Sequence, residues 1–184
     1  MNNEPLFEIF VQAPPGLEVI LRDEAIAAGF RKPKATDGGI RFRGRWSDVW
    51  RANLVLRGAS RVLVRIAEFQ VMHLKQLEKA ASDISWSRYF ADNEPVRVEV
   101  STRRSKIYHA GAARERVERA LMGAGIPVDR EAELSVRVRL DNNQCTLSLD
   151  TSGELLHKRG YKAAVGKAPM RENLAALFLR EAGY

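Results

Sequence analysis

Residues 134–149 read Leu-Ser-Val-Arg-Val-Arg-Leu-Asp-Asn-Asn-Gln-Cys-Thr-Leu-Ser-Leu, and this stretch indicates the kind of fold that the chain adopts. Apolar residues alternate with polar ones on both sides of Asp141-Asn142-Asn143, a sequence that favours a tight turn. Alternation with a period of two places the apolar side chains on one face of a strand. The stretch therefore predicts an antiparallel hairpin with one buried face.

The residues before this hairpin predict another strand and two helices. The strand lies at 96–100, one helix at 113–124 and an earlier helix at 74–84. A basic loop at 102–109, Thr-Arg-Arg-Ser-Lys-Ile-Tyr-His, separates that strand from the helix that follows it. Together with the hairpin these elements predict a mixed α/β layer.

The first part of the chain, residues 5–69, predicts a separate β-α-β-β-α-β unit, which is the ferredoxin-like arrangement. A short segment reaching Thr36 supplies its second strand, and Ser47 is expected to cap its second helix. On that helix we expect Val49, Trp50, Asn53 and Leu54 to share one side, with Trp46 and Trp50 in the core.

Composition narrows the function classes. Hydrophobic residues make up 45% of the chain and charged residues 29%, which is typical of a globular protein. The net charge of +7 favours an anionic partner such as nucleic acid, although such an excess also serves solubility alone. No apolar run approaches the roughly 20 residues that span a bilayer. We expect a soluble, cytoplasmic protein that does not bind membranes.

Residue types that carry chemistry are scarce. The one cysteine, Cys145, excludes a disulfide within the chain and a cysteine zinc site, and its strand position predicts a small buried side chain. His73, His109 and His157 lack the spacing of metal ligands. The sequence therefore predicts no catalytic residue and no metal site.

The tail, from residue 154 onward, is a basic segment and a link that precede one more helix. Residues 154–162 read Glu-Leu-Leu-His-Lys-Arg-Gly-Tyr-Lys and precede a basic link at 163–168. Pro169 suits the first turn of a helix whose apolar stripe is Leu174, Leu177 and Phe178. We expect this helix to have almost no chain left to pack on, and to open a further domain.

Two tail segments, 152–162 and 168–176, closely resemble the junction in bacterial THUMP-containing RNA methyltransferases. The best-known members of that family modify guanine N2 in large-subunit ribosomal RNA. The segments 50–54 and 61–63 resemble the family's first domain, and 105–109 resembles its THUMP loop. The resemblance covers essentially the whole chain.

The resemblance implies three parts: a ferredoxin-like domain at 1–70, a THUMP RNA-binding domain at 71–162, and a linker with the first helix of a methyltransferase domain at 163–184. The methyltransferase domain of the family uses S-adenosylmethionine. This sequence has neither the glycine-rich cofactor loop after a strand nor the Asn/Asp-Pro-Pro-aromatic motif for the target amine. We therefore expect no cofactor in this chain and S-adenosylmethionine in the domain that would follow.

Two basic segments are candidates for RNA binding. Cations suit phosphates, an aromatic ring suits an unstacked base, and the basic loop precedes a helix N-terminus. A solvated loop and a tail that packs against the sheet are the structural alternatives. The candidate residues are Arg103, Arg104, Lys106 and Tyr108 in the loop, and His157, Lys158, Arg159, Tyr161 and Lys162 in the tail.

The predicted function is the RNA-docking part of a ribosomal RNA methyltransferase, with RNA and its own methyltransferase domain as partners. One alternative is a protein-interaction or ribosome-assembly module that uses the free sheet face near Phe10 and Leu63. Another is the THUMP module of a tRNA-modifying enzyme.

Overall fold

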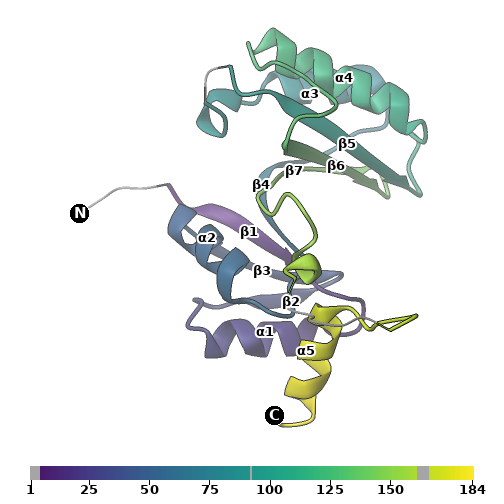
Figure 1. The fold of residues 1–184 in the computed structure, drawn as a ribbon. Helices are drawn as coiled ribbons and strands as arrows, with labels where there is room; N and C mark the ends of the chain where they lie inside the picture. The colour runs from purple at the N-terminus through teal and green to yellow at the C-terminus, as the bar shows by residue number, and fades with distance from the viewer. Residues whose placement is uncertain (1–4, 92, 161–165) are drawn as a thin grey trace. The chain divides into compact units, whose positions relative to one another are not determined.

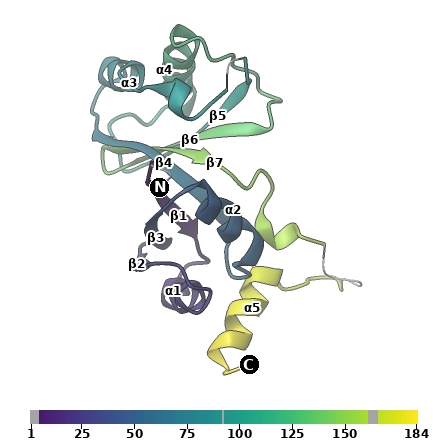
Figure 2. The same cartoon turned by 90° about the vertical axis from the view of Figure 1, so that its left-hand side faces the viewer.

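The computed structural model describes residues 5–91, 93–160 and 166–184. It divides into two compact units, Met1–Val64 with Glu154–Tyr184, and Arg65–Gly153. Both combine a sheet with helices (Figures 1 and 2), so the predicted α/β class is confirmed. The boundaries of these two units differ from those of the three predicted domains. The first boundary falls within β4, and the tail from Glu154 onward belongs to the first unit. The predicted domain boundaries stay a prediction.

The first unit has the predicted β-α-β-β-α-β order. Its strands follow the order β2-β3-β1-β4, with β1 and β2 both antiparallel to β3. The elements are β1 (Phe7–Gln12), α1 (Glu18–Ala27), β2 (Lys34–Thr36), β3 (Gly39–Gly44), α2 (Trp46–Val55) and the beginning of β4 (Arg61–Gln70).

One face of this sheet forms the core because the strand register aligns the apolar positions. Ile9 lies opposite Phe42 and Val11 opposite Ile40, and all four are buried. The helices cover this face with small and branched side chains, which allow them to approach the strands closely. The buried helix residues are Leu21 and Ala25 from α1 and Val49 and Ala52 from α2.

Two predictions about α2 are wrong. The helix begins at Trp46, one residue before the predicted cap Ser47, and Asp48 accepts a hydrogen bond from the Arg45 backbone N–H at 3.0 Å instead. Trp50 is 67% exposed and Leu54 75% exposed, because Val49 and Ala52 face the sheet. Trp46 is half-buried, with its ring 4.9 Å from that of Phe7.

The second unit places two helices on a sheet of order β4-β7-β6-β5. β5 and β6 are parallel, and β6 and β7 form the predicted hairpin, with positive φ at Asn142 and Asn143. The buried faces of α3 and α4 contain Leu77 and Val117. The elements are the end of β4, α3 (Leu74–Ser82), η1 (Trp86–Arg88), β5 (Val96–Arg103), α4 (Ala110–Gly123), β6 (Leu134–Asp141) and β7 (Gln144–Asp150).

The tail does not lack a packing partner, contrary to prediction. It contains η2 (Leu156–Lys158) and α5 (Glu172–Glu181), and α5 packs against α1 and η2 within the first unit. Leu177 is 1% exposed, and Nδ2 of Asn173 donates to Oγ of Ser60 at 2.9 Å. Pro169 precedes the helix instead of opening it, because Arg171 is the N-cap.

Candidate nucleic-acid interface

Four of the predicted RNA-binding residues lie where β5 leads into α4. Arg103, Arg104, Lys106 and Tyr108 are all exposed, Tyr108 to 70%. Arg104 has a φ of 47°, so the chain turns sharply after the strand. The structure therefore presents these four side chains together, on one short loop before a helix N-terminus.

The β6–β7 turn holds this loop in place. The Lys106 backbone N–H donates to Oδ1 of Asn143 at 2.8 Å, and the Asn143 N–H donates to Oγ of Ser105 at 3.0 Å. At the end of the loop, Oγ1 of Thr102 donates to the carbonyl oxygen of Tyr108 at 3.1 Å. The exposed side chains thus extend from a fixed backbone, which lowers the entropy cost of binding a ligand.

A cavity of about 520 Å³ opens beside the loop, at the beginning of both α3 and α4. The first turn of α4 has no side-chain cap, so its backbone N–H groups keep the partial positive charge of a helix N-terminus. The ring of Tyr108 lies 4.2 Å from that of His109. The lining residues are Met72, His73, Leu74, Lys75 and Gln76 from the α3 side, and Lys106, Ile107, Tyr108, His109 and Ala112 from the α4 side.

Two arginines of β6, by contrast, are neutralised by carboxylates. Arg137 lies 2.8 Å from both Glu99 and Asp150, and Arg139 lies 2.7 Å from Asp141. The hydrogen bond from Arg139 holds the pKa of Asp141 below its usual value, and the charges of Arg103 and Arg104 act in the same direction. The outward arginines of β6 are thus ion-pair partners, whereas those of the loop remain open to an anion.

Comparison with known families agrees with this geometry. Residues 8–63 match the model of the RlmL ferredoxin-like domain, and residues 72–150 match that of the THUMP domain. Residues 8–63 therefore form a ferredoxin-like domain, and residues 72–150 form a THUMP domain. The basic loop and its cavity belong to the THUMP domain.

Relatives of known name or structure extend beyond this chain. The chain is 37% identical to ribosomal RNA large subunit methyltransferase K/L of Syntrophotalea carbinolica, over 96% of its own length and 26% of the relative's. A predicted N6-adenine-specific DNA methylase from Listeria monocytogenes is 28% identical, with a TM-score of 0.87 over 96% of this chain and 48% of that one. SMU.472, solved as a complex with SAH, shares the fold at 21% identity and a TM-score of 0.88, over 98% and 50% of the two chains. The chain thus spans about a quarter of the curated relative's length.

The predicted tail residues have mixed roles outside the THUMP domain. Arg159 donates to the carbonyl oxygens of Leu54 at 2.7 Å, Leu56 at 3.0 Å and Leu156 at 3.1 Å. Lys158 is exposed and lies 3.5 Å from Glu154, and His157 is half-buried. Tyr161 and Lys162 lie outside the described residues. Arg159 is thus held by backbone carbonyl oxygens of its own unit, a place that the packing alternative did not name, and the RNA-binding prediction for the tail stays a prediction.

The residues that the sequence prediction missed come from the beginning of α3. Met72, His73, Lys75 and Gln76 meet the basic loop at the cavity, although about 30 positions separate the two segments. No motif marks this pairing, because two amphipathic helices can pack in more than one arrangement on a sheet.

Within residues 5–91, 93–160 and 166–184, no three His, Cys, Asp or Glu side chains gather closely enough to hold a metal ion. Over the same residues, no helix combines the length and the apolar character that a membrane crossing requires.

Proposed function

We propose that this chain docks RNA for a methyltransferase, and that the THUMP loop with its cavity makes the contact. The observation that carries the proposal is the position of Arg103, Arg104, Lys106 and Tyr108, exposed on a fixed loop at the beginning of α4. Phosphates would lie against the cations and the free N–H groups of the helix. One unpaired base would enter the cavity and stack on Tyr108.

The size and the chemistry of this cavity support an unpaired RNA base as its occupant. Its volume of about 520 Å³ lies within the range of small-ligand pockets, and Ile107, Met72 and Leu74 supply apolar walls. Lys106 at the rim supplies charge for the neighbouring phosphate. Single-stranded RNA ends and loops offer this combination, because their bases are free of pairing partners.

For the whole protein we propose methylation of guanine N2 in large-subunit ribosomal RNA, with S-adenosylmethionine as methyl donor, in the cytoplasm. The names of the relatives support methylation of large-subunit ribosomal RNA, and the complex of SMU.472 with SAH supports the methyl donor. Cofactors of this kind bind at glycine-rich strand-to-helix turns, and the turns after β1, β3, β4 and β5 contain at most one glycine, Gly16. The described residues do not fit the cofactor, so the proposal assigns it to the part of the relatives that this chain does not cover.

Binding to RNA across a salt series tests the docking proposal. The 184-residue chain is titrated against a large-subunit rRNA fragment and a tRNA, each with a single-stranded end. Changing Arg103, Arg104 and Lys106 to Gln removes three cations, and each lost phosphate contact reduces the log–log salt slope by about 0.7. We expect a slope shallower by about 2. Tyr108→Ala is expected to weaken binding by about 1–3 kcal/mol and to leave the slope unchanged, because it removes stacking and no charge.

A matched control variant changes Arg57, Lys79 and Arg130 to Gln, three exposed cations that line neither the cavity nor the loop. If both triple variants changed the slope equally, binding would follow total charge and the loop would lose its role. Stronger binding to tRNA than to rRNA would favour the tRNA-modifying alternative.

A further inference from the structure

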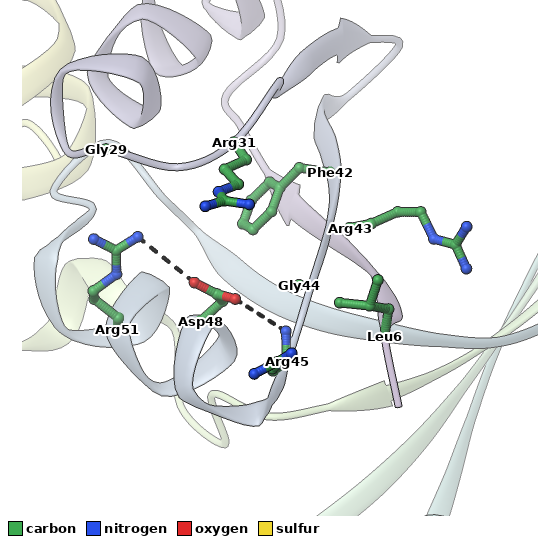
Figure 3. Close-up of a pocket in the computed structure, with 9 residues that line it drawn as sticks. All are labelled: Leu6, Gly29, Arg31, Phe42, Arg43, Gly44, Arg45, Asp48 and Arg51. Carbon is green, nitrogen blue, oxygen red and sulfur yellow. Dashed lines mark hydrogen bonds and ion pairs between the residues drawn. The ribbon is translucent and has the colours of Figure 1, made fainter. Parts of the chain in front are cut away.

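The ferredoxin-like domain carries a second group of unpaired cations. All are exposed, and no ion pair forms with any of them among the residues that the structure describes. They surround two adjoining cavities of about 470 and 630 Å³, which share Arg31, Phe42 and Arg43. Figure 3 shows the lining of the first cavity. We define this group as the β2–β3 cationic surface; its members are Arg31, Lys32, Lys34, Arg41, Arg43 and Arg45.

Unlike the six cations of this surface, the neighbouring Arg51 has partners for its charge. Arg51 donates to the carbonyl oxygen of Ala28 at 3.0 Å, lies 3.6 Å from Asp48, and sits 4.1 Å above the Phe30 ring. Asp48 also accepts the Arg45 backbone N–H, as Figure 3 shows. This carboxylate is therefore already engaged, and Glu8 is the other acid that lines the cavities.

The strand register opposes two like charges at one position of this surface, although it also places Glu8 opposite Arg43. Lys34 lies directly opposite Arg41 in the β2–β3 pair. Like charges at opposed positions destabilise a sheet, and Lys32 adds a further cation in the left-handed region, at a φ of 49°. Folding alone would favour other residues at these positions. A bound anion would relieve the repulsion.

The spacing of the cations fits a chain of anions better than a single one. Arg41 and Arg43 point away from the core, since their neighbours Ile40 and Phe42 are buried. Alternate residues of a strand lie roughly 6–7 Å apart, and Arg45 continues the row with extended backbone. Arginine also binds phosphate oxygens with two parallel hydrogen bonds.

We propose that the β2–β3 cationic surface binds the sugar–phosphate backbone of a second stretch of the same RNA. The identity of the nucleic acid rests on the proposed function. The surface offers positive charge but no exposed aromatic ring for a base to stack on, because Phe42, which lines both cavities, is buried. It therefore takes paired RNA, whereas the THUMP loop takes an unpaired end.

The test uses the full chain with two probes, a blunt RNA duplex and the same duplex with a single-stranded 3′ tail. The variant Lys34→Gln/Arg41→Gln/Arg43→Gln removes three cations of the surface. We expect its salt slope to be shallower than that of the unchanged chain by about 2 on both probes. Its melting temperature should be equal or higher, because the Lys34–Arg41 repulsion is removed.

Two comparisons decide the result. The variant Arg57→Gln/Lys79→Gln/Arg130→Gln controls for total charge. The variant Arg103→Gln/Arg104→Gln/Lys106→Gln controls for the THUMP loop. If the surface variant matches the charge control while the loop variant still weakens binding to the tailed probe, the second site is refuted and RNA docking stands. If the unchanged chain binds neither probe in a salt-dependent manner, the proposed function fails as well.

Discussion

Arg159 acts at the carboxyl end of α2, where the carbonyl oxygens of Leu54 and Leu56 accept its hydrogen bonds. Such oxygens at a helix end have no partner within the helix, and a cation there also offsets the helix dipole. Arg159→Gln should therefore lower the free energy of unfolding by about 1–2 kcal/mol in urea titrations, and leave the salt slope of RNA binding unchanged.

Lys158→Gln is the matched control for that change. Lys158 is exposed and its partner Glu154 lies 3.5 Å away at the surface, so stability should change by less than about 0.5 kcal/mol. A flatter salt slope for Arg159→Gln with normal stability would contradict the structural role and support the RNA-binding prediction.

Cys145 is a buried side chain of β7, as predicted, and burial raises the pKa of its thiol to about 12. In the unfolded chain the thiol ionises near 8.5. Because the folded state holds this proton more tightly, stability from this group is complete below pH 8 and falls as the pH rises from about 9 toward 12.

The rate of alkylation of Cys145 tests whether its thiol is buried and protonated. At pH 8 the folded protein should react with iodoacetamide at least about tenfold more slowly than the urea-unfolded chain, since the thiolate is the reactive form. Equal rates would mean that the thiol is accessible. Cys145→Ser should remove the difference by removing the reactive group.

At the scale of elements, α5 depends on a glycine of the loop after α2. A Cβ at Gly58 would lie 2.7 Å from Cγ of Leu177 and 2.8 Å from Oε2 of Glu24. Glu24 accepts the backbone N–H groups of Arg57 and Gly58, so it has little freedom to move. Gly58→Ala should destabilise the packing of α5 by about 1–3 kcal/mol.

Hydrogen exchange detects that change. Amides of 173–181 should lose protection in Gly58→Ala, while those of β5, β6 and β7 keep theirs. Gly123→Ala is the control, because a Cβ there meets no atom within 4 Å and the residue ends a helix. Uniform loss of protection in both units would contradict a local effect on α5.

At the scale of the molecule, the net charge of +7 is distributed unevenly. Arg137 and Arg139 are compensated by carboxylates, whereas the THUMP loop and the β2–β3 cationic surface are not. Among the described residues, each unit thus carries an uncompensated basic surface. Phe10 and Leu63, which the protein-interaction alternative required, are 6% and 8% exposed and offer little apolar area to a partner. The two proposed RNA sites together predict a steeper salt slope than either would give alone.

The sequence by itself determined the elements and both domain types. Alternation at 134–149 and the Asn142–Asn143 turn are local properties, and together they favour a hairpin in one register. It also placed Arg103, Arg104, Lys106 and Tyr108 on one loop, since they are neighbours in the chain.

Only the tertiary structure decided which helix faces are buried and which charged side chains have partners. Trp50 and Val49 are adjacent apolar residues of one helix, and the choice of the buried one depends on the sheet beneath it. Arg159 and Lys158 look alike in sequence, yet only Arg159 meets the end of α2, a hundred residues earlier. Contacts across such separations depend on how the units of secondary structure pack, and no local pattern encodes that arrangement.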